Sequence, residues 1–373
     1  MGLFVEWNRP IKAGISPCMA RPRKIGVLTF HRCINYGSYW QARCLVEGLR
    51  ARGFDAELLD HRCDCVERAE LRCAFQPKLP ERTPRTELSA YGTKTRKFHD
   101  AFRKLPLSKR FSLHRPRDAG AYDAIVVGSD EVWNFRHPWY GSKPIFFGDG
   151  LRAERLVSYA ASFGNHSAWD GIDPEWAAKL DGFSALSVRD ENSWHLVHGG
   201  LGAKPQLVLD PCLQFPDAAE APPANGRAYA LVYGHGFPAW LRTAVRRWSR
   251  KAGFPLVSVG YFNGWADEQR VSAGPLEFAS LVAGAQAVVT NFFHGCVFAM
   301  LYGKPWAAHP SGYRSIKIPD LAATLGAEDR LVDEATSDTS LRELLSTPIR
   351  ASVASRIAER RERSDAFLDA ALA

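Results

Sequence analysis

A histidine, His294, lies where an apolar run of the sequence changes into a helical pattern. Residues 287–290 read as a buried strand, and helical spacing begins just after Gly295. Beyond the carboxyl end of a parallel strand, the next helix offers backbone N–H groups and a partial positive charge. A histidine there can give or take a proton beside a bound anion. The alternative is structural, with His294 capping the helix or bonding within the fold.

Polar and small residues also follow the first predicted strand. Asn35, Tyr36 and Gly37 lie between a strand at 24–30 and a helix that starts at residue 38. A glycine at this point lets backbone approach a ligand closely. The stretch lacks a GxGxxG pattern, so we infer no dinucleotide, and a purely structural turn is the other interpretation.

A third group follows the strand predicted at 123–128. Ser129, Asp130 and Asn134 are expected at the same edge of the sheet. Asp130 could orient or deprotonate a sugar hydroxyl. Capping of the next helix is an equally common use of an aspartate at such a position.

Basic residues follow two more predicted strands. Arg189 ends a strand at 185–189, and its guanidinium suits a phosphate or a carboxylate, although a surface ion pair would also explain it. Arg314 and Lys317 come after a strand at 305–308. They are expected to add positive charge around the same cleft, or else to begin a solvated helix.

Length and composition limit the classes of function. The chain has 373 residues, 46% of them hydrophobic and 24% charged, which is ordinary for a globular protein and favours two domains. A net charge of +8 favours anionic partners. No zinc-finger spacing, RNP-like run or basic block is present, so we predict no nucleic-acid partner. No apolar run is long enough for a membrane span.

The cysteines and the missing motifs narrow the chemistry further. The eight cysteines show no CxxC pair, and no secretory signal precedes them, so we expect reduced thiols in the cytoplasm. Cys63, Cys65, Cys73 and His61 have poor spacing for zinc, and we predict no metal. Patterns for a serine hydrolase elbow, a Walker A loop, HExxH and Asp-x-Asp are absent. The residues alone thus predict an α/β enzyme with a positively charged, anion-binding cleft.

Strands alternate with helices in both halves of the sequence, which predicts two Rossmann-like, doubly wound α/β domains with a cleft between them. A stretch rich in Pro and Ala separates the halves. The terminal helix either packs back across the domains or is solvated. We predict an N-terminal extension at 1–23, a first domain at 24–213 with a basic helical insertion at about 62–120, a linker at 214–226, a second domain at 227–350 and a C-terminal helix at 351–373.

The order of short motifs is specific, although each motif alone is weak. NYGS-x-x-Q, GSDEVWN, SYAASFG, SVRDE, LDP, GPLEF and TNFFHG followed by KP occur in that order. Together, over about residues 24–331, they resemble the polysaccharide pyruvyl transferase family. The resemblance implies a GT-B-like fold and transfer of pyruvate from phosphoenolpyruvate to a sugar of a cell-surface polysaccharide or its precursor, as a ketal. It implies no cofactor beyond this donor.

The resemblance also assigns roles to the residues named above. His294 matches the family histidine and would protonate the enol carbon, and Asp130 would act on the sugar hydroxyl. Phosphoenolpyruvate would be held by Arg189, Gly295, Arg314 and Lys317, and the sugar or its loop by Asn35, Tyr36, Gly37, Ser129 and Asn134. One position departs from the pattern: Phe293 stands where some members carry an arginine.

Two other functions stay open at this point. One is a metal-independent GT-B-type glycosyltransferase that uses a nucleotide sugar. The other is a non-catalytic glycan-binding or assembly protein, against which the intact His294, Arg189 and Asp130 argue. On the leading hypothesis the partners are phosphoenolpyruvate and a glycan or lipid-linked oligosaccharide acceptor. We expect a cytoplasmic protein, with peripheral contact at the inner face of the membrane as a further expectation.

Overall fold

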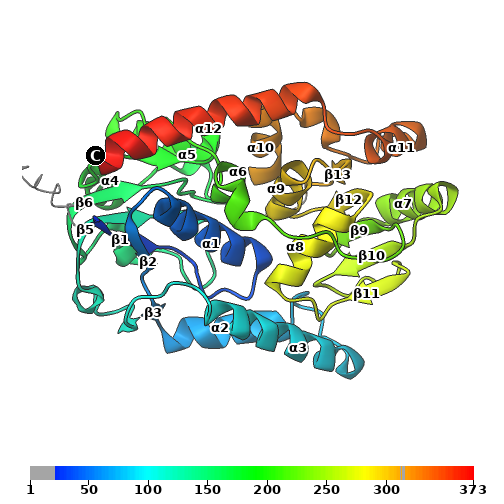
Figure 1. Ribbon diagram of the computed structural model, residues 1–373, viewed down its shortest axis with the longest axis horizontal. Coiled ribbons are helices and arrows are strands. Elements are labelled where there is room, and N and C mark those ends of the chain that lie inside the picture. The colour runs from blue at the N-terminus through cyan, green and yellow to red at the C-terminus, as the bar shows by residue number, and fades with distance from the viewer. Residues whose placement is uncertain (1–21, 311, 313–315) are drawn as a thin grey trace, which may run out of the picture.

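Two parallel β-sheets, one from each half of the sequence, organise the chain (Figure 1). The structure is a computed structural model and describes residues 22–310, 312 and 316–373. The first sheet has four strands in the order β2-β1-β5-β6, all parallel. These are β1 (Lys24–Leu28), β2 (Asp55–Leu58), β5 (Ala121–Val127) and β6 (Arg152–Ser158). A parallel β7–β8 pair, β7 (Ser187–Val188) and β8 (Gln206–Leu207), continues beyond β6.

The second sheet has five parallel strands in the order β11-β10-β9-β12-β13. They are β9 (Ala230–Tyr233), β10 (Leu256–Val259), β11 (Glu268–Arg270), β12 (Ala287–Thr290) and β13 (Trp306–Ala308). The inner strands are wholly buried, as their uninterrupted apolar sequences predict. The edge strand β11 has the sequence Glu-Gln-Arg, which carries no strand pattern, and sequence analysis missed it.

Helices connect the strands and confirm the predicted α/β class with two parallel sheets. They are α1 (Tyr36–Ala51), α4 (Pro174–Asp181), α5 (Glu191–Leu201), α6 (Pro211–Gln214), α7 (Ala239–Ala252), α8 (Pro275–Gly284), α9 (Phe293–Leu301), α10 (Lys317–Leu325), α11 (Asp338–Ser346) and α12 (Ala351–Leu372). None of the helices in the described ranges combines the length and apolarity needed to cross a bilayer.

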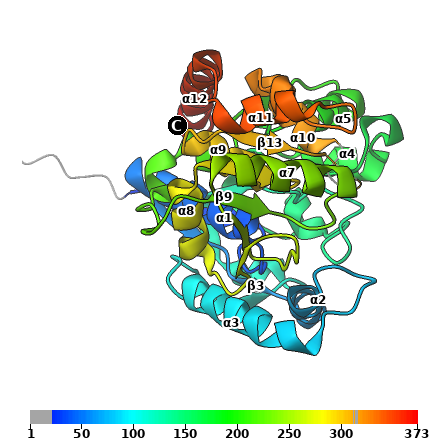
Figure 2. The same cartoon turned by 90° about the vertical axis from the view of Figure 1, so that its right-hand side faces the viewer.

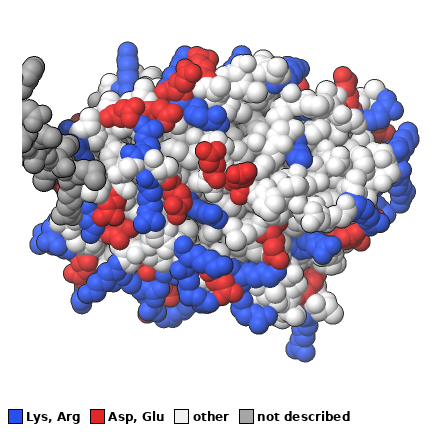
Figure 3. All heavy atoms as spheres, viewed as in Figure 1, with Lys and Arg blue, Asp and Glu red and all other residues white. Residues whose placement is uncertain are grey.

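The basic segment between β2 and β5 forms helices α2 (Asp64–Phe75) and α3 (Arg85–Phe102), beside a short parallel pair, β3 (His61–Arg62) and β4 (Phe111–Ser112). Both helices lie along the lower edge in Figures 1 and 2, where Lys and Arg side chains gather in Figure 3. Helix α3 is tied to the second half: Lys97 pairs with Glu277 at 2.6 Å, and the Tyr91 hydroxyl accepts from the Phe262 N–H at 3.2 Å.

The last helix, α12, runs back across the molecule from the second half to the first (Figure 1). The Ser364 hydroxyl accepts from the Leu209 N–H at 3.0 Å, and Arg52, directly after α1, pairs with Asp365 at 2.5 Å. Val353 and Leu368 are buried. The packed alternative for this helix is therefore the one observed.

The two halves share one continuous hydrophobic core, which includes residues of both sheets and of α1, α8, α9 and α12. Tyr36 of α1 stacks on Phe278 of α8 with ring centroids 4.4 Å apart, and its hydroxyl donates to the Ala273 carbonyl at 2.7 Å. Trp40 donates to the Pro275 carbonyl at 3.0 Å. The halves are thus fastened together on one side of the cleft, and the domain limits given above stay a prediction.

The cysteines of the described residues are free thiols. Cys63 lies beside Cys65 and 3.5 Å from His114, whereas the His61 ring contacts the Thr29 carbonyl. Cys73 lies elsewhere, in the wall of the cleft. His61, Cys63, Cys65 and Cys73, which the sequence analysis weighed as a metal cluster, therefore do not form one group in the structure.

Close packing of β12 against α9 depends on Gly295. A Cβ atom added there would overlap the Thr290 side chain, which is buried. We predict that Gly295→Ala lowers the free energy of unfolding by about 1–3 kcal/mol, measured by urea denaturation. Gly199→Ala in α5 is the matched control, because an added Cβ meets no atom within 4 Å there. Equal stability of the two variants would contradict the packing described.

Candidate active site

A cavity of about 510 Å³ lies between the two halves, beyond the carboxyl ends of strands from both sheets. Loops after β1, β5, β7, β9, β10, β12 and β13 converge on it, as expected for parallel sheets. Helices α2 and α3 contribute a further wall. Its polar lining comprises Asn35, Ser38, Glu70, Lys94, Asp130, Glu131, His137, Arg189, His235, His294 and Lys317.

Arg189 is the centre of a buried ion-pair network in this cavity. Its guanidinium donates to Asp210 at 3.0 Å and faces Asp130 at 3.4 Å, and the side chain is almost wholly buried. Burial opposes the charged form, but the carboxylates of Asp130 and Asp210 outweigh it and raise the pKa of Arg189. The alternative of a surface ion pair is therefore not the one observed, because Arg189 and its carboxylate partners are buried.

Phe293 has a clear place in the same network. The Arg189 guanidinium lies over the Phe293 ring, 4.5 Å from its centroid. An arginine stacked on an aromatic face gains a cation–π contact without a further charge. Phe293 therefore stabilises Arg189 and adds no charge of its own.

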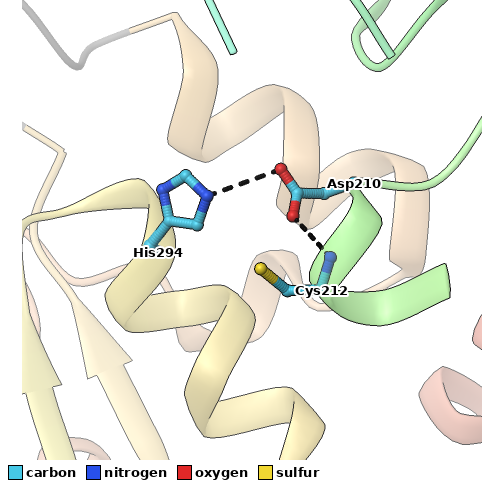
Figure 4. A group of neighbouring side chains, drawn as sticks. All are labelled: Asp210, Cys212 and His294. Atoms are coloured by element: carbon cyan, nitrogen blue, oxygen red, sulfur yellow. Dashed lines mark hydrogen bonds and ion pairs between the residues drawn. The ribbon is translucent and has the colours of Figure 1, made fainter. Parts of the chain in front are cut away.

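His294 lies in the first turn of α9, which begins at Phe293 and so starts three residues earlier than the sequence pattern indicated. Its Nε2 atom is 3.5 Å from an Asp210 carboxylate oxygen (Figure 4). That distance suits an ion pair better than a hydrogen bond. The ring also lies against Gly37, because a Cβ atom added there would overlap Nδ1, Cγ and Cε1.

Asp210 is the functional candidate that sequence reasoning missed. Burial alone would raise the pKa of Asp210, but His294 and Arg189 together hold it well below its usual range. The carboxylate is therefore ionised and orients both partners. The signal in the sequence was the LDP motif. In the structure this aspartate follows β8 and caps α6 by accepting from the Cys212 N–H at 3.0 Å.

The ligand atoms of Asp210, Cys212 and His294 lie within 4.8 Å of one another, close enough to raise the question of a metal (Figure 4). Two features weigh against that use. The guanidinium of Arg189 already holds Asp210 and would repel a cation. Burial raises the pKa of the Cys212 thiol, which disfavours the thiolate that a metal requires. We therefore interpret the group as support for the imidazole.

Asp130 takes part in a second set of bonds. It accepts from the Ser38 hydroxyl at 2.7 Å and from the Glu131 N–H at 3.0 Å. Its φ of 74° is rare for a residue with a side chain, and such a conformation persists where surrounding contacts fix it. The neighbouring Glu131 forms a buried ion pair with Lys317 at the start of α10.

The remaining predicted residues are divided between the cavity and the packing around it. Asn35 lines the cavity and caps α1 by accepting from the Gly37 N–H at 2.8 Å. Tyr36 is buried in the contact between the halves, as described above. Ser129 donates to the Ala160 carbonyl at 3.0 Å, and Asn134 donates to Glu131 at 2.7 Å, so both support the loop from behind.

Two predicted donor-binding residues have different positions. Gly295 donates its N–H to the Phe292 carbonyl at 2.9 Å and packs against Thr290, outside the cavity lining. Arg314 lies outside the described residues. Of the predicted cations, the structure therefore brings Arg189 and Lys317 to the cavity.

The expectation of a positively charged cleft needs a correction. Arg189 faces Asp130 and Asp210, and Lys317 faces Glu131, so the carboxylates of this network outnumber its arginine and lysine. A proton on His294 makes the cluster neutral. Counting basic residues along the sequence could not show this balance, because the partners come from distant loops.

Two α/β halves with parallel sheets meet at a cavity that holds a buried histidine, an arginine and carboxylates, an arrangement that suits an enzyme active site. The sequence matches the polysaccharide pyruvyl transferase family over residues 35–308, and the chain belongs to that family. His294, Arg189 and Asp210 all lie within the matched range.

Solved structures with similar folds are distant in sequence. UDP-GlcNAc 2-epimerase from Methanocaldococcus jannaschii is 11% identical, with a TM-score of 0.47 over 87% of this chain and 91% of that one. The glycosyltransferase SnogD from Streptomyces nogalater is 14% identical, with a TM-score of 0.42 over 92% and 96%. The E. coli heptosyltransferase WaaC is 12% identical, with a TM-score of 0.38 over 82% and 97%. No curated protein sequence was found to match the chain.

The contact between Gly37 and His294 gives a direct test of the site. A Cβ atom added at Gly37 would overlap the imidazole. We predict that Gly37→Ala turns the ring away from Asp210 and destabilises the fold by about 1–3 kcal/mol. Side-chain NMR resonances of His294 would report the ring movement.

Gly92→Ala on α3 is the control, because its Cβ would meet only the Phe75 ring, at 3.6 Å. His294 resonances that are unchanged in Gly37→Ala would show that the two residues do not touch.

Proposed function

We propose that this protein transfers pyruvate from phosphoenolpyruvate to a sugar of a cell-surface polysaccharide or its precursor, forming a pyruvate ketal. The observation that carries the proposal is the buried pair of His294 and Asp210 beside Arg189, in a cavity within the family match. An imidazole held by an ionised carboxylate is a suitable general acid, because its added charge is balanced when it carries the proton.

The first step is protonation of the enol. His294 gives a proton to C3 of phosphoenolpyruvate, the electrons of the C2–C3 double bond form the new C–H bond, and C2 becomes electron-deficient. Nδ1 is the nitrogen that we assign to this transfer, because Nε2 faces Asp210. The Arg189 guanidinium, fixed by its carboxylate partners, is positioned to contact the donor's carboxylate or phosphate.

The second step joins the sugar. A hydroxyl oxygen attacks C2 and its proton passes to Asp130. The Asp130 oxygen that accepts from the Ser38 hydroxyl can accept a further donor, because a carboxylate oxygen has two lone pairs. The C2–O bond to phosphate then breaks, and phosphate leaves with the bonding electrons and takes the proton from Asp130, which restores the carboxylate. A second hydroxyl of the same sugar attacks C2 and closes the ketal, and its proton returns to the imidazole.

The acceptor substrate is described only by its chemical class. The family description names a polysaccharide, and the cavity between the halves is large enough for a donor and one sugar residue. We propose a polymeric or lipid-linked glycan acceptor, with access to the latter at a membrane surface.

A direct assay tests the function. Purified protein is given phosphoenolpyruvate with candidate glycans, and acceptor-dependent phosphate release and ketal formation are followed. We predict that His294→Gln lowers kcat by about 10²–10⁴-fold, because the general acid is removed. His195→Gln is the control, since this histidine is exposed on α5 and outside the cavity lining.

The proposal fails if no glycan yields phosphate and if the ketal content of the surface glycan is unchanged in a strain that carries His294→Ala. Turnover of a nucleotide sugar without phosphoenolpyruvate would indicate a glycosyltransferase instead. Glycan binding without either reaction would indicate a non-catalytic protein.

A further inference from the structure

Lys94 is a buried cation in the wall of the cavity, and neither the sequence patterns nor the mechanism above involve it. It lies on α3, in the helical segment between β2 and β5, and is 3% exposed. Its ammonium donates to the Gly260 carbonyl at 2.9 Å, in the second half of the molecule. Lys94 therefore belongs to a helix of the first half, contacts the second half, and lines the cavity between them.

The surroundings of Lys94 are aromatic. The ammonium lies 4.5 Å from the ring centroid of Tyr261 and 4.9 Å from that of Tyr36. The nearby titratable groups are these two tyrosines and the thiol of Cys73 on α2. Aromatic faces and one carbonyl compensate a buried charge only in part, and an ammonium carries three donors.

The other cations of the lining are in a different situation. Arg189 has Asp130 and Asp210, and Lys317 has Glu131. No carboxylate of residues 22–310, 312 and 316–373 forms an ion pair with Lys94. Buried charges are usually paired, so a lysine that lines a cavity without a carboxylate partner has capacity for an anion from outside.

We propose that Lys94 binds an anionic group, a carboxylate or a phosphate, of the small molecule that enters the cavity, and so supplies the second cation that Phe293 does not. This assignment rests on the proposed function only for the identity of the anion, phosphoenolpyruvate. It also explains the helical segment, since α3 delivers a donor-binding residue to the cleft while Lys97, one turn away, fastens the helix to Glu277.

Ligand binding should then be coupled to a proton. Burial lowers the pKa of Lys94 to about 7, so the side chain is largely neutral at pH 8 until an anion stabilises the ammonium. Binding at pH 8 is therefore expected to take up about one proton. For the same reason the affinity for the anion should fall by about tenfold for each pH unit above 7.

The experiment is isothermal titration calorimetry of the full chain with phosphoenolpyruvate, inorganic phosphate, pyruvate and UDP, in two buffers of different ionisation enthalpy at pH 8. The wild-type protein should show proton uptake with phosphoenolpyruvate. Lys94→Met should abolish that uptake and weaken binding by roughly 10- to 100-fold. Lys104→Met is the control and should change neither, because Lys104 is exposed just after α3 and outside the cavity lining.

The four probes separate the anionic groups of the donor. If phosphate binding depends on Lys94 and pyruvate binding does not, Lys94 meets the phosphate, and the reverse result assigns the carboxylate. Equal affinity of wild type and Lys94→Met for phosphoenolpyruvate overturns the inference, as does a wild-type protein that binds none of the four probes. Lys94→Gln repeats the comparison if the Met variant unfolds, and proton uptake by the wild type requires no variant.

The inference and the proposed function can fail separately. If Lys94→Met leaves ketal formation unchanged, the proposed function stands and a role for Lys94 in it is excluded. If the protein binds phosphate or UDP through Lys94 but forms no ketal, the anion site is supported and the proposed pyruvyl transfer is contradicted.

Discussion

The burial of Arg189 is the constraint on which the site depends. A guanidinium removed from water must be paired, and here Asp130, Asp210 and the face of Phe293 supply its partners. Each partner comes from a different loop: Asp130 follows β5, Asp210 precedes α6 and Phe293 begins α9. The network therefore fixes the positions of three loops relative to one another, and breaking one pair would leave an uncompensated charge worth about 3–5 kcal/mol.

The same network fixes the position of His294. Asp210 is shared between Arg189 and His294, so the carboxylate that neutralises the arginine also orients the imidazole. Gly37 permits the arrangement because a side chain at that position would occupy the space of the ring. The shared core between the halves keeps Gly37, from the first half, against α9 of the second. Fold and site are thus stabilised by the same contacts.

Charge in the cleft is distributed differently from charge along the chain. Most basic residues of the segment between β2 and β5 face solvent. Elsewhere in the chain, Arg189 and Lys317 are neutralised by the carboxylates beside them. Lys94 differs because α3 carries it across the cleft to a surface of tyrosine rings and one carbonyl. An excess of positive charge in the sequence therefore says little about the potential inside the cavity, where a single partner decides it.

The sequence by itself determined the α/β class, the alternation of strands and helices, and the loops that carry His294, Arg189 and Asp130, because hydrophobic periodicity and strand ends are local properties. It also placed the chain in its family through the order of its motifs. It did not single out Asp210 or Lys94, set the start of α9 three residues too late, and did not show that Gly295 packs on Thr290 or that Tyr36 joins the two halves. Only the tertiary structure decided which charges are paired, which glycines are pressed against a neighbour and which helix crosses the cleft, since these depend on residues far apart in the chain that meet through packing.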